Sequence, residues 1–499
     1  MGLILTSAFV MMGVFFMVGM YVAGAIGLLS LLLMYFFSDA PLWNILGNKA
    51  WEPSNNFILI AVPLFILMGE IMLRSGIGDR MYNAIARWMN RLPGGLLHTN
   101  IASCSIFAAC AGSSAATAAT ISRVALPTFQ KKNYDERMVL GSLAAGGTLG
   151  ILIPPSIGII LWGVLMEESI GRLYLAGFIP GFMLAFLMML MIAGLALAFP
   201  SIAPKEAVSS WKDRFVGLLA LIPIFAIIFM VLGTIYMGLA TPTEAAAFGV
   251  TGALVLALIS NSGPSIMFRY LEKANRNGGL PFLPQRTRAR MLELGERYPA
   301  KAGQLRESMS YNMEMIKAAT LAAARTSGMI FLIVISAFVM SFAFVRLGIS
   351  QNLSAMVISW DMTTVQLVVT LTVFYLLLGT FMEPTAMLLC TVPILGPILY
   401  AAEIDLVGVG IIVIIIGEAA IISPPEGINL YILHGVRQDV NAETAKAEGV
   451  KAPESTILDV WIGVLPFMFV MVVMIGLLIV FPEIATWLPD TVMGKRGRG

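Results

Sequence analysis

The feature that most constrains this chain is a series of apolar stretches, most of them long enough to cross a bilayer. A transmembrane helix needs ~20 mostly apolar residues, and backbone in lipid must satisfy its own polar groups, which leaves helices as the expected elements. Only 12% of the residues are charged and mean hydropathy is +0.88, which excludes an ordinary soluble domain. Candidate crossings lie at residues 8–36, 55–73, 138–164, 172–200, 215–237, 243–260, 318–345, 406–433 and 458–481.

Two further apolar stretches, at residues 95–129 and 364–399, are too long for one crossing. Each contains a break near its middle: the first at Ala111-Gly112-Ser113-Ser114, the second between Gly379 and Pro384. Backbone that leaves the helical ladder at membrane depth must be enclosed by protein or face water. We therefore predict two re-entrant helical hairpins.

Paired prolines interrupt two of the candidate crossings, at Pro154-Pro155 and Pro424-Pro425. Two adjacent prolines remove two backbone donors and free carbonyls of the preceding turn, and lipid cannot satisfy those carbonyls. The alternative is a structural kink, but a break at matching positions of two segments is typical of a binding site. Freed carbonyls suit a hard cation such as sodium, which prefers oxygen ligands.

The landmarks of the first half return in the second half, in the same order and at nearly one spacing. Chance among common residues is the alternative, but three ordered matches favour an internal duplication. The matches are Arg74, Gly76 and Ile77 with Arg346, Gly348 and Ile349; Pro127 with Pro397; and Pro154-Pro155 with Pro424-Pro425.

Charge placement predicts that the two copies are inverted. Basic residues flank the first hairpin and acidic residues flank the second, so the positive-inside rule places the mouth of the first hairpin in the cytoplasm and the second on the opposite side. The same counting places the basic C-terminal tail, 495–498, outside. The flanking residues are Arg80, Arg87, Arg91, Lys131, Lys132 and Arg137 for the first hairpin, and Asp361, Glu403 and Asp405 for the second.

Segments 78–92 and 348–360 mix apolar and polar residues at helical spacing and are too short to span, so we expect interfacial helices with Trp88 and Trp360 at headgroup depth. The predicted organisation is scaffold helices at 1–76 and 201–260, a first repeat at 77–200, a basic cytoplasmic insertion at 261–311, a second repeat at 312–440, and a C-terminal loop and last helix at 441–499.

Polar side chains gather at the breaks, where restarting half-helices present N-termini that favour an anion. The residues that could contact a substrate carboxylate are Ser113, Ser114, Thr117, Ser156, Thr385 and Asn429; the alternative for each is helix capping or small-residue packing.

Acidic residues inside apolar segments are costly and point to function. They are Glu70, Glu244, Glu383, Glu418 and Glu426. Glu383 and Glu426 are candidates for a cation-coupling or proton-linked role; the alternative is an N-cap carboxylate at a restarted helix, which we favour for Glu383.

Enzyme and nucleotide motifs are absent from the sequence. It holds no HExxH, GxSxG, P-loop or dinucleotide fingerprint, so the energy for any transport is expected from an ion gradient or a partner. The formal net charge of +2 gives no indication of nucleic acid binding. The three cysteines lie in apolar runs without metal-ligand spacing and are read as packing residues.

The chain resembles the large membrane subunit of the tripartite ATP-independent periplasmic (TRAP) transporters. The resemblance covers nearly the whole chain and is carried by the hairpin tip at 111–114, the run from Ala145 to Ser156 that ends in Pro-Pro-Ser, residues 169–173 and 176–181, Thr241-Pro242-Thr243-Glu244, and the second Pro-Pro break. It implies an elevator-type ion-transporter fold in a bacterial inner membrane, with sodium as the coupling ion and small carboxylates as substrates. It also implies a small four-helix membrane subunit and a periplasmic binding protein as partners.

By matching position, the resemblance implies sodium sites made largely of backbone carbonyls. The residues are Ala111, Ser114, Gly150, Ile153 and Pro154 in the first repeat and Gly379, Ala420, Ser423 and Glu426 in the second. Glu426 departs from the family, because a small or apolar residue is expected after the two prolines, and the segment 261–311 resembles an insertion. The alternative function is a stand-alone ion-coupled anion symporter with a similar inverted-repeat fold.

Overall fold

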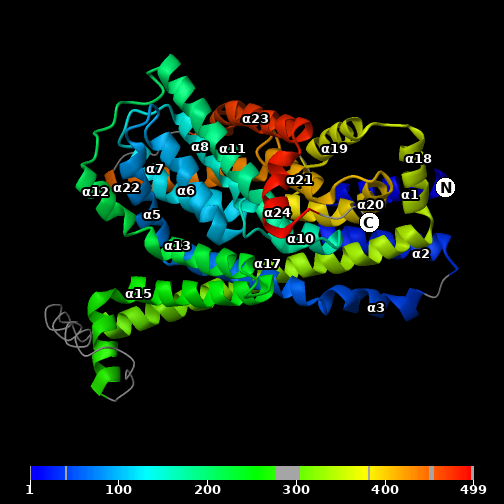
Figure 1. Ribbon diagram of the computed structural model, residues 1–499, viewed down its shortest axis with the longest axis horizontal. Coiled ribbons are helices and arrows are strands. Elements are labelled where there is room, and N and C mark those ends of the chain that lie inside the picture. The colour runs from blue at the N-terminus through cyan, green and yellow to red at the C-terminus, as the bar shows by residue number, and fades with distance from the viewer. Residues whose placement is uncertain (1, 40–41, 277–303, 380–381, 449–454, 496–499) are drawn as a thin grey trace.

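The computed structural model describes residues 2–39, 42–276, 304–379, 382–448 and 455–495, and every regular element in these ranges is a helix (Figure 1). Within them, six helices are long and apolar enough to cross a membrane, or up to eight if each of two bent pairs is one span. The all-helical, polytopic prediction is confirmed. Most of the predicted basic insertion and the last four residues of the C-terminal tail lie outside the described ranges.

Seven helical elements of the first half return in the second half in the same order. The predicted interfacial segments form α5 (Ile77–Met89) and α18 (Ile349–Ser359), the two arm helices. Each starts after a glycine in the left-handed region, Gly76 at φ 65° and Gly348 at φ 71°, where a side chain would be strained. The first set is α4 (Ala61–Arg74), α5 (Ile77–Met89), α6 (Leu96–Ala111), α7 (Ser114–Phe129), α8 (Glu136–Gly147) with α9 (Leu149–Leu152), α10 (Ile157–Leu165) and α11 (Ile170–Ala198). The second is α17 (Gln304–Arg346), α18 (Ile349–Ser359), α19 (Thr364–Gly379), α20 (Pro384–Ala401), α21 (Leu406–Ala420), α22 (Ile428–Glu448) and α23 (Ile457–Val480).

The two copies point in opposite directions. The first hairpin, α6 and α7, lies near one end of the molecule together with α5, whereas α18 and the second hairpin, α19 and α20, lie near the other end (Figure 1). Both predicted hairpins and both Pro-Pro breaks are present. The repeats are therefore inverted, as the flanking charges predict.

Several boundaries differ from prediction. Helices α15 (Pro242–Arg276) and α17 extend past the predicted crossings 243–260 and 318–345 into both ends of the predicted insertion. The stretch 8–36 forms two helices, α1 (Gly2–Met17) and α2 (Val22–Phe37), because the chain turns at Gly19 with φ 74°. The stretch 215–237 is α12 (Trp211–Leu218), α13 (Ile222–Ile228), a π-helical segment at 229–233 and α14 (Thr234–Tyr236), with a 40° bend. Pro223 supports this break, since it fits only the first turn of a new helix. Helix α22 continues past 433 to Glu448. Arg437 and Asn441 in this polar end have partners on other elements, so the helix is held beyond the apolar stretch.

The remaining elements are α3 (Leu42–Ser54), the 3-10 turn η1 (Phe57–Ile60), α15 (Pro242–Arg276) and α24 (Glu483–Met493). Helices α15 and α17 run side by side along one edge of the molecule (Figure 1), and α4 packs against both. These three helices form one side of the fold.

Each repeat packs against the other through equivalent elements. Helix α22, the second half of one broken helix, packs on α7 of the first hairpin, and its counterpart α10 packs on α20 of the second hairpin. Likewise α23 packs along α8 and α11 packs along α21. The hairpins and broken helices therefore form one unit that includes both copies.

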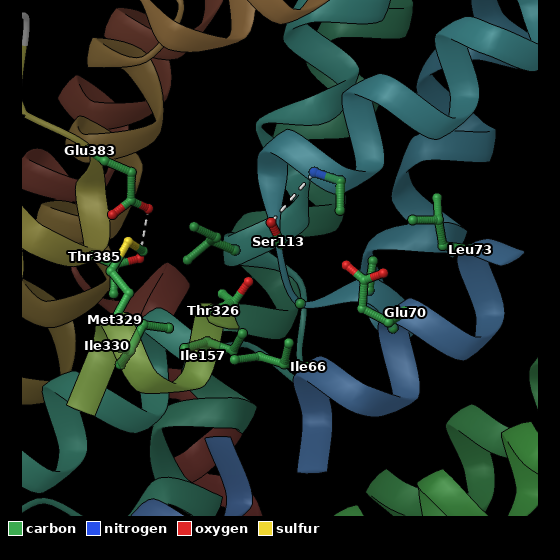
Figure 2. A pocket seen from close by; sticks show the side chains of 15 residues that line it. Ile66, Glu70, Leu73, Ser113, Ile157, Thr326, Met329, Ile330, Glu383 and Thr385 are labelled. Carbon is green, nitrogen blue, oxygen red and sulfur yellow. Dashed lines mark hydrogen bonds between the residues drawn. The ribbon is translucent and has the colours of Figure 1, made fainter. Parts of the chain in front are cut away.

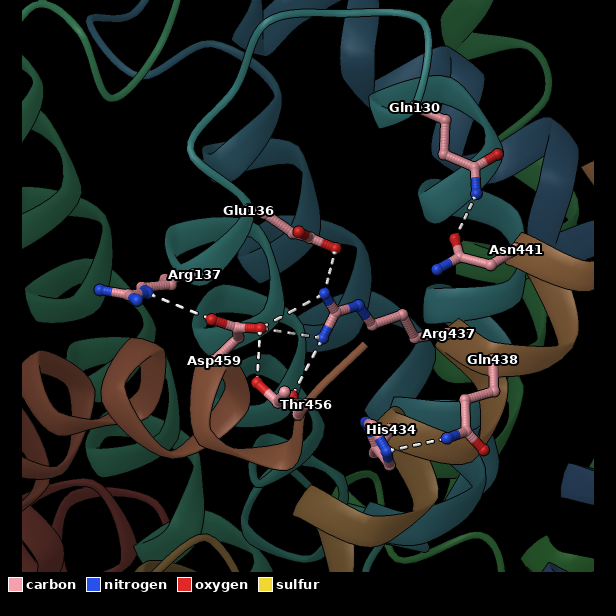
Figure 3. A network of polar contacts seen from close by, with 9 residues as sticks. All are labelled: Gln130, Glu136, Arg137, His434, Arg437, Gln438, Asn441, Thr456 and Asp459. Atoms are coloured by element: carbon pink, nitrogen blue, oxygen red, sulfur yellow. Dashed lines mark hydrogen bonds and ion pairs between the residues drawn. The ribbon is translucent and has the colours of Figure 1, made fainter. Parts of the chain in front are cut away.

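Polar contacts fix the bases of the hairpins to these partner helices. Arg437 on α22 is 4% exposed and pairs with Glu136 of α8 at 2.7 Å and with Asp459 of α23 at 3.5 Å (Figure 3). Beside it, the Gln130 amide at the end of α7 donates to Asn441 at 2.7 Å. Together these contacts connect α7, α8, α22 and α23.

Candidate functional site

The tip of the first hairpin lies directly on the first Pro-Pro break. Gly112, at φ 60°, ends α6, and the Ser113 hydroxyl caps α7 by accepting from the Ala116 N–H at 3.4 Å. A Cβ added to Gly150 would lie 2.7 Å from the Ser113 carbonyl oxygen, so the helix before the break touches the tip backbone. This part of the predicted sodium set is therefore brought together in space.

Beyond the first break, Ser156 caps α10. Its hydroxyl accepts from the Ile159 N–H at 3.3 Å and donates to the Ile151 carbonyl, a group that the break would otherwise leave unpaired. The Thr117 hydroxyl donates to the Ser113 carbonyl at 2.8 Å. Ser156 thus has the capping geometry that was the alternative to substrate contact, whereas Thr117 bonds back to the preceding turn of its own helix.

The second tip and break repeat this arrangement. A Cβ added to Gly379 would lie 2.3 Å from the Ala420 Cβ, so the end of α19 touches the end of α21. Ser423 donates to the Ala419 carbonyl at 2.8 Å, and Asn429 is 1% exposed with no partner for its Nδ2. Glu426 is exposed, and its predicted place among the sodium ligands stays a prediction.

Glu383 caps α20, which is the alternative that the sequence offered. Its two carboxylate oxygens accept from the Thr385 hydroxyl at 2.7 Å and from the Ala386 N–H at 3.1 Å. A carboxylate at a helix N-terminus is favoured by the free N–H groups and by the helix dipole.

A buried carboxylate on the second copy contacts the tip of the hairpin of the first copy. Glu418 on α21 is 0% exposed, and the Ser114 hydroxyl at the first tip donates to its two carboxylate oxygens at 2.8 and 2.7 Å. Within the described residues no basic side chain pairs with it. A lone ionised carboxylate in an apolar interior costs several kcal/mol, so Glu418 in its ionised form would need a cation close by.

A cavity of about 110 Å³ lies between both tips and the helices α4 and α17. Figure 2 shows Glu383 and Thr385 on one side of it, Glu70 on the other, and Ser113 between them. Glu70 is paired with Arg74 at 3.1 Å. The other lining residues are Ile66, Gly69, Leu73, Ala111, Gly112, Ala116, Ile151, Ile157, Thr326, Met329 and Ile330.

Of the predicted substrate residues, Ser113 and Thr385 line this cavity and Ser114, Thr117, Ser156 and Asn429 do not. The sequence reading missed Thr326, which lies on α17 with no motif around it. It also left Glu418 without a role, although an acidic residue in an apolar stretch was the signal that could have found it.

The chain matches the family model of the tripartite ATP-independent periplasmic transporter, DctM component, over residues 9–484. The chain belongs to this family. A C4-dicarboxylate TRAP large permease of Vibrio cholerae is 28% identical over 96% of this chain and 95% of that protein. A sialic acid TRAP large permease of the same organism is 27% identical over 88% of each chain, and an ectoine TRAP large permease of Halomonas elongata is 29% identical over 87% and 86%.

A solved structure supports the fold of this TRAP permease. The YdaH transporter of Alcanivorax borkumensis aligns with a TM-score of 0.51 at 14% identity, covering 93% of this chain and 98% of that one. At this identity the likeness shows the fold alone. Together with the family match and the apolar helices, it makes this chain an inner-membrane large permease of the TRAP type.

Proposed function

We propose that this large TRAP permease takes up a small organic acid together with sodium ions, delivered by a periplasmic binding protein and assisted by a small four-helix subunit. The substrate class follows relatives whose names specify C4-dicarboxylate and sialic acid. Sodium is cargo in this scheme. One sodium site uses Ala111, Ser114, Gly150, Ile153 and Pro154, and the other uses Gly379, Ala420, Ser423 and Glu426.

The observation that carries the sodium proposal is Glu418. Its carboxylate is fully buried and, among the residues that the structure describes, bonds only to Ser114, itself one of the proposed sodium ligands. A sodium ion at the first tip would compensate a charge that no described basic residue compensates. Because Ser114 and Glu418 belong to different repeats, ion binding at one tip would also tighten the contact between the two copies.

The lining of the cavity favours coupled binding of sodium and the organic acid over independent binding of each. Two carboxylates, Glu70 and Glu383, face it, and no Lys or Arg is among its described lining residues. An anion would therefore gain its favourable contacts from the Ser113 hydroxyl, the N-terminus of α7 and nearby cations. Sodium that binds first would offset the negative charge of the lining and lower the electrostatic cost of placing a carboxylate in the cavity.

An elevator movement fits the way the cavity is bounded. The hairpins and broken helices form one cross-packed unit, whereas α4, α15 and α17 pack with one another along the other side. The cavity lies between these two groups. Sliding of the cross-packed unit along the second group would carry the tips, with bound ions and substrate, across the membrane.

Uptake by purified protein in proteoliposomes tests the proposal. With the small subunit present, we expect uptake of a C4-dicarboxylate or another small organic acid only when a cognate binding protein and an inward sodium gradient are both supplied. Replacing external sodium with choline should abolish uptake. Uptake that proceeds at full rate without a binding protein would favour the stand-alone symporter instead.

The Gly150→Ala variant tests the contact between tip and break. The added methyl group would lie 2.7 Å from the Ser113 carbonyl oxygen, and overpacking of this kind costs about 1–3 kcal/mol. We expect the sodium concentration for half-maximal uptake to rise about tenfold or more. Gly328→Ala on α17, with no atom within 4 Å of its added Cβ, is the matched control. Equal sodium dependence in both variants would argue against a sodium site at this contact.

A further inference from the structure

An arginine of α12 is buried without a charge partner. Arg214 is 2% exposed, and in the described part of the chain neither its Nε nor its Nη2 has a hydrogen-bond partner. Within the described residues it forms no ion pair. Because a buried guanidinium is costly unless an anion satisfies it, an anion brought close to this side chain would be strongly favoured.

Further basic and aromatic side chains surround Arg214 where α5 meets α12, at the end of the molecule that holds the first hairpin (Figure 1). The guanidinium groups of Arg214 and Arg91 lie 5.0 and 5.5 Å from the centroid of the same Trp211 ring. Arg87 reaches α12 as well, donating to the Asp213 carbonyl at 3.2 Å. Cation–π contacts offset part of the repulsion among these cations, but they supply no counter-charge.

The aromatic rings place this cluster at headgroup depth. Trp88 packs edge-on against Trp211 and Phe215, with ring centroids 6.4 and 5.7 Å apart. Tryptophan is enriched at membrane interfaces, and the charge pattern of the sequence puts this end in the cytoplasm. Further along the chain, exposed apolar side chains follow the cluster from the end of α12 into α13, among them Leu219 at 63% exposure and Ile222 at 57%.

We propose that Arg87, Arg91 and Arg214 bind the phosphate of an anionic phospholipid of the cytoplasmic leaflet, whose acyl chains lie along Phe215, Leu219 and Ile222. Guanidinium groups match phosphate oxygens in geometry and charge, and this leaflet is rich in anionic lipid. A soluble phosphate would explain the arginines but not the exposed apolar strip that continues from them. The membrane lipid is therefore the occupant that both features fit.

The second repeat offers an internal comparison. Its arm helix α18, Ile349–Ser359, contains no Lys or Arg, although Trp360 follows it with 51% exposure. The two arms occupy equivalent places at opposite ends of the fold, so only the cytoplasmic one is equipped for an anionic headgroup. Because α5 connects α4 to the first hairpin, a lipid held there would fix the height of this arm in the membrane.

Tryptophan quenching by brominated lipids tests the site in the full-length protein. We expect brominated phosphatidylglycerol to quench more strongly than brominated phosphatidylcholine in wild-type vesicles. Arg214→Gln and Arg91→Gln should each lower the apparent preference for phosphatidylglycerol about fivefold. Arg346→Gln, at the end of α17, and Trp360→Phe are controls that should keep the preference.

Arg91 is exposed, so its variant keeps the test decisive if Arg214→Gln fails to fold. Equal quenching by the two lipids in the wild type would overturn the proposal. Loss of the preference on addition of millimolar inorganic phosphate would identify a free-phosphate site instead. Loss of the small subunit on purification of Arg91→Gln, with lipid preference unchanged, would assign the cluster to a protein partner and equally overturn the lipid site.

Discussion

Replacing Glu418 with glutamine is expected to raise the sodium concentration for half-maximal uptake about 10- to 100-fold, because a hydrogen bond or contact to a charged group contributes about 1.5–3 kcal/mol. Glutamine keeps the shape of the side chain and can still accept from Ser114. The change therefore removes the charge that sodium is proposed to compensate and little else. Uptake assays over a range of sodium concentrations measure the effect.

The same variant separates an ion-coupling role from a structural one. Without sodium, wild-type protein buries a lone carboxylate, so Glu418→Gln should be as stable as wild type or more stable. With saturating sodium, the wild type should gain thermal stability and the variant should gain little. Glu443→Gln, an exposed carboxylate on α22, is the matched control. A variant that loses stability equally with and without sodium would indicate a purely structural contact.

Replacing both Pro154 and Pro155 with alanine is expected to abolish sodium-dependent uptake while the protein still inserts. Each proline-to-alanine change favours a continuous helix by about 3 kcal/mol, which would straighten the 40° bend between α8–α9 and α10. Carbonyls now directed at the first tip would return to the helical ladder. We expect the loss of coupled uptake to exceed ~100-fold, since it corresponds to ~2.7 kcal/mol or more.

The control for this double variant is Pro127→Ala, which removes a proline within α7 away from the Pro-Pro break. It should insert and transport with nearly unchanged sodium dependence. Membrane fractionation checks insertion, and uptake with sodium or choline checks coupling. Wild-type sodium dependence in the Pro154→Ala, Pro155→Ala variant would contradict the proposed role of the break.

Features encoded locally were predictable from the sequence. Gly76 and Gly348 recur because an arm helix starts after a left-handed turn in both copies. Both hairpin tips and both Pro-Pro breaks also appear where the small residues and prolines stand. In each case a few adjacent residues decide the backbone, so no knowledge of distant contacts is needed.

Features made by long-range packing were not predictable. Ser114 and Glu418 are 304 residues apart in sequence, and nothing near either one specifies the other. Thr326 enters the cavity only because α17 packs beside the second hairpin. Helix α22 exceeds its predicted end because Arg437 and Asn441 find partners on other helices, which a hydropathy pattern does not register.

Parallel measurement of radioactive sodium and labelled organic acid entering the same proteoliposomes tests the central claim most directly. With the small subunit and a substrate-loaded binding protein present, we expect that sodium enters only while substrate enters, in a fixed ratio, and that Glu418→Gln lowers both fluxes together at low sodium. Substrate accumulation at an undiminished rate in the absence of any sodium flux would contradict it.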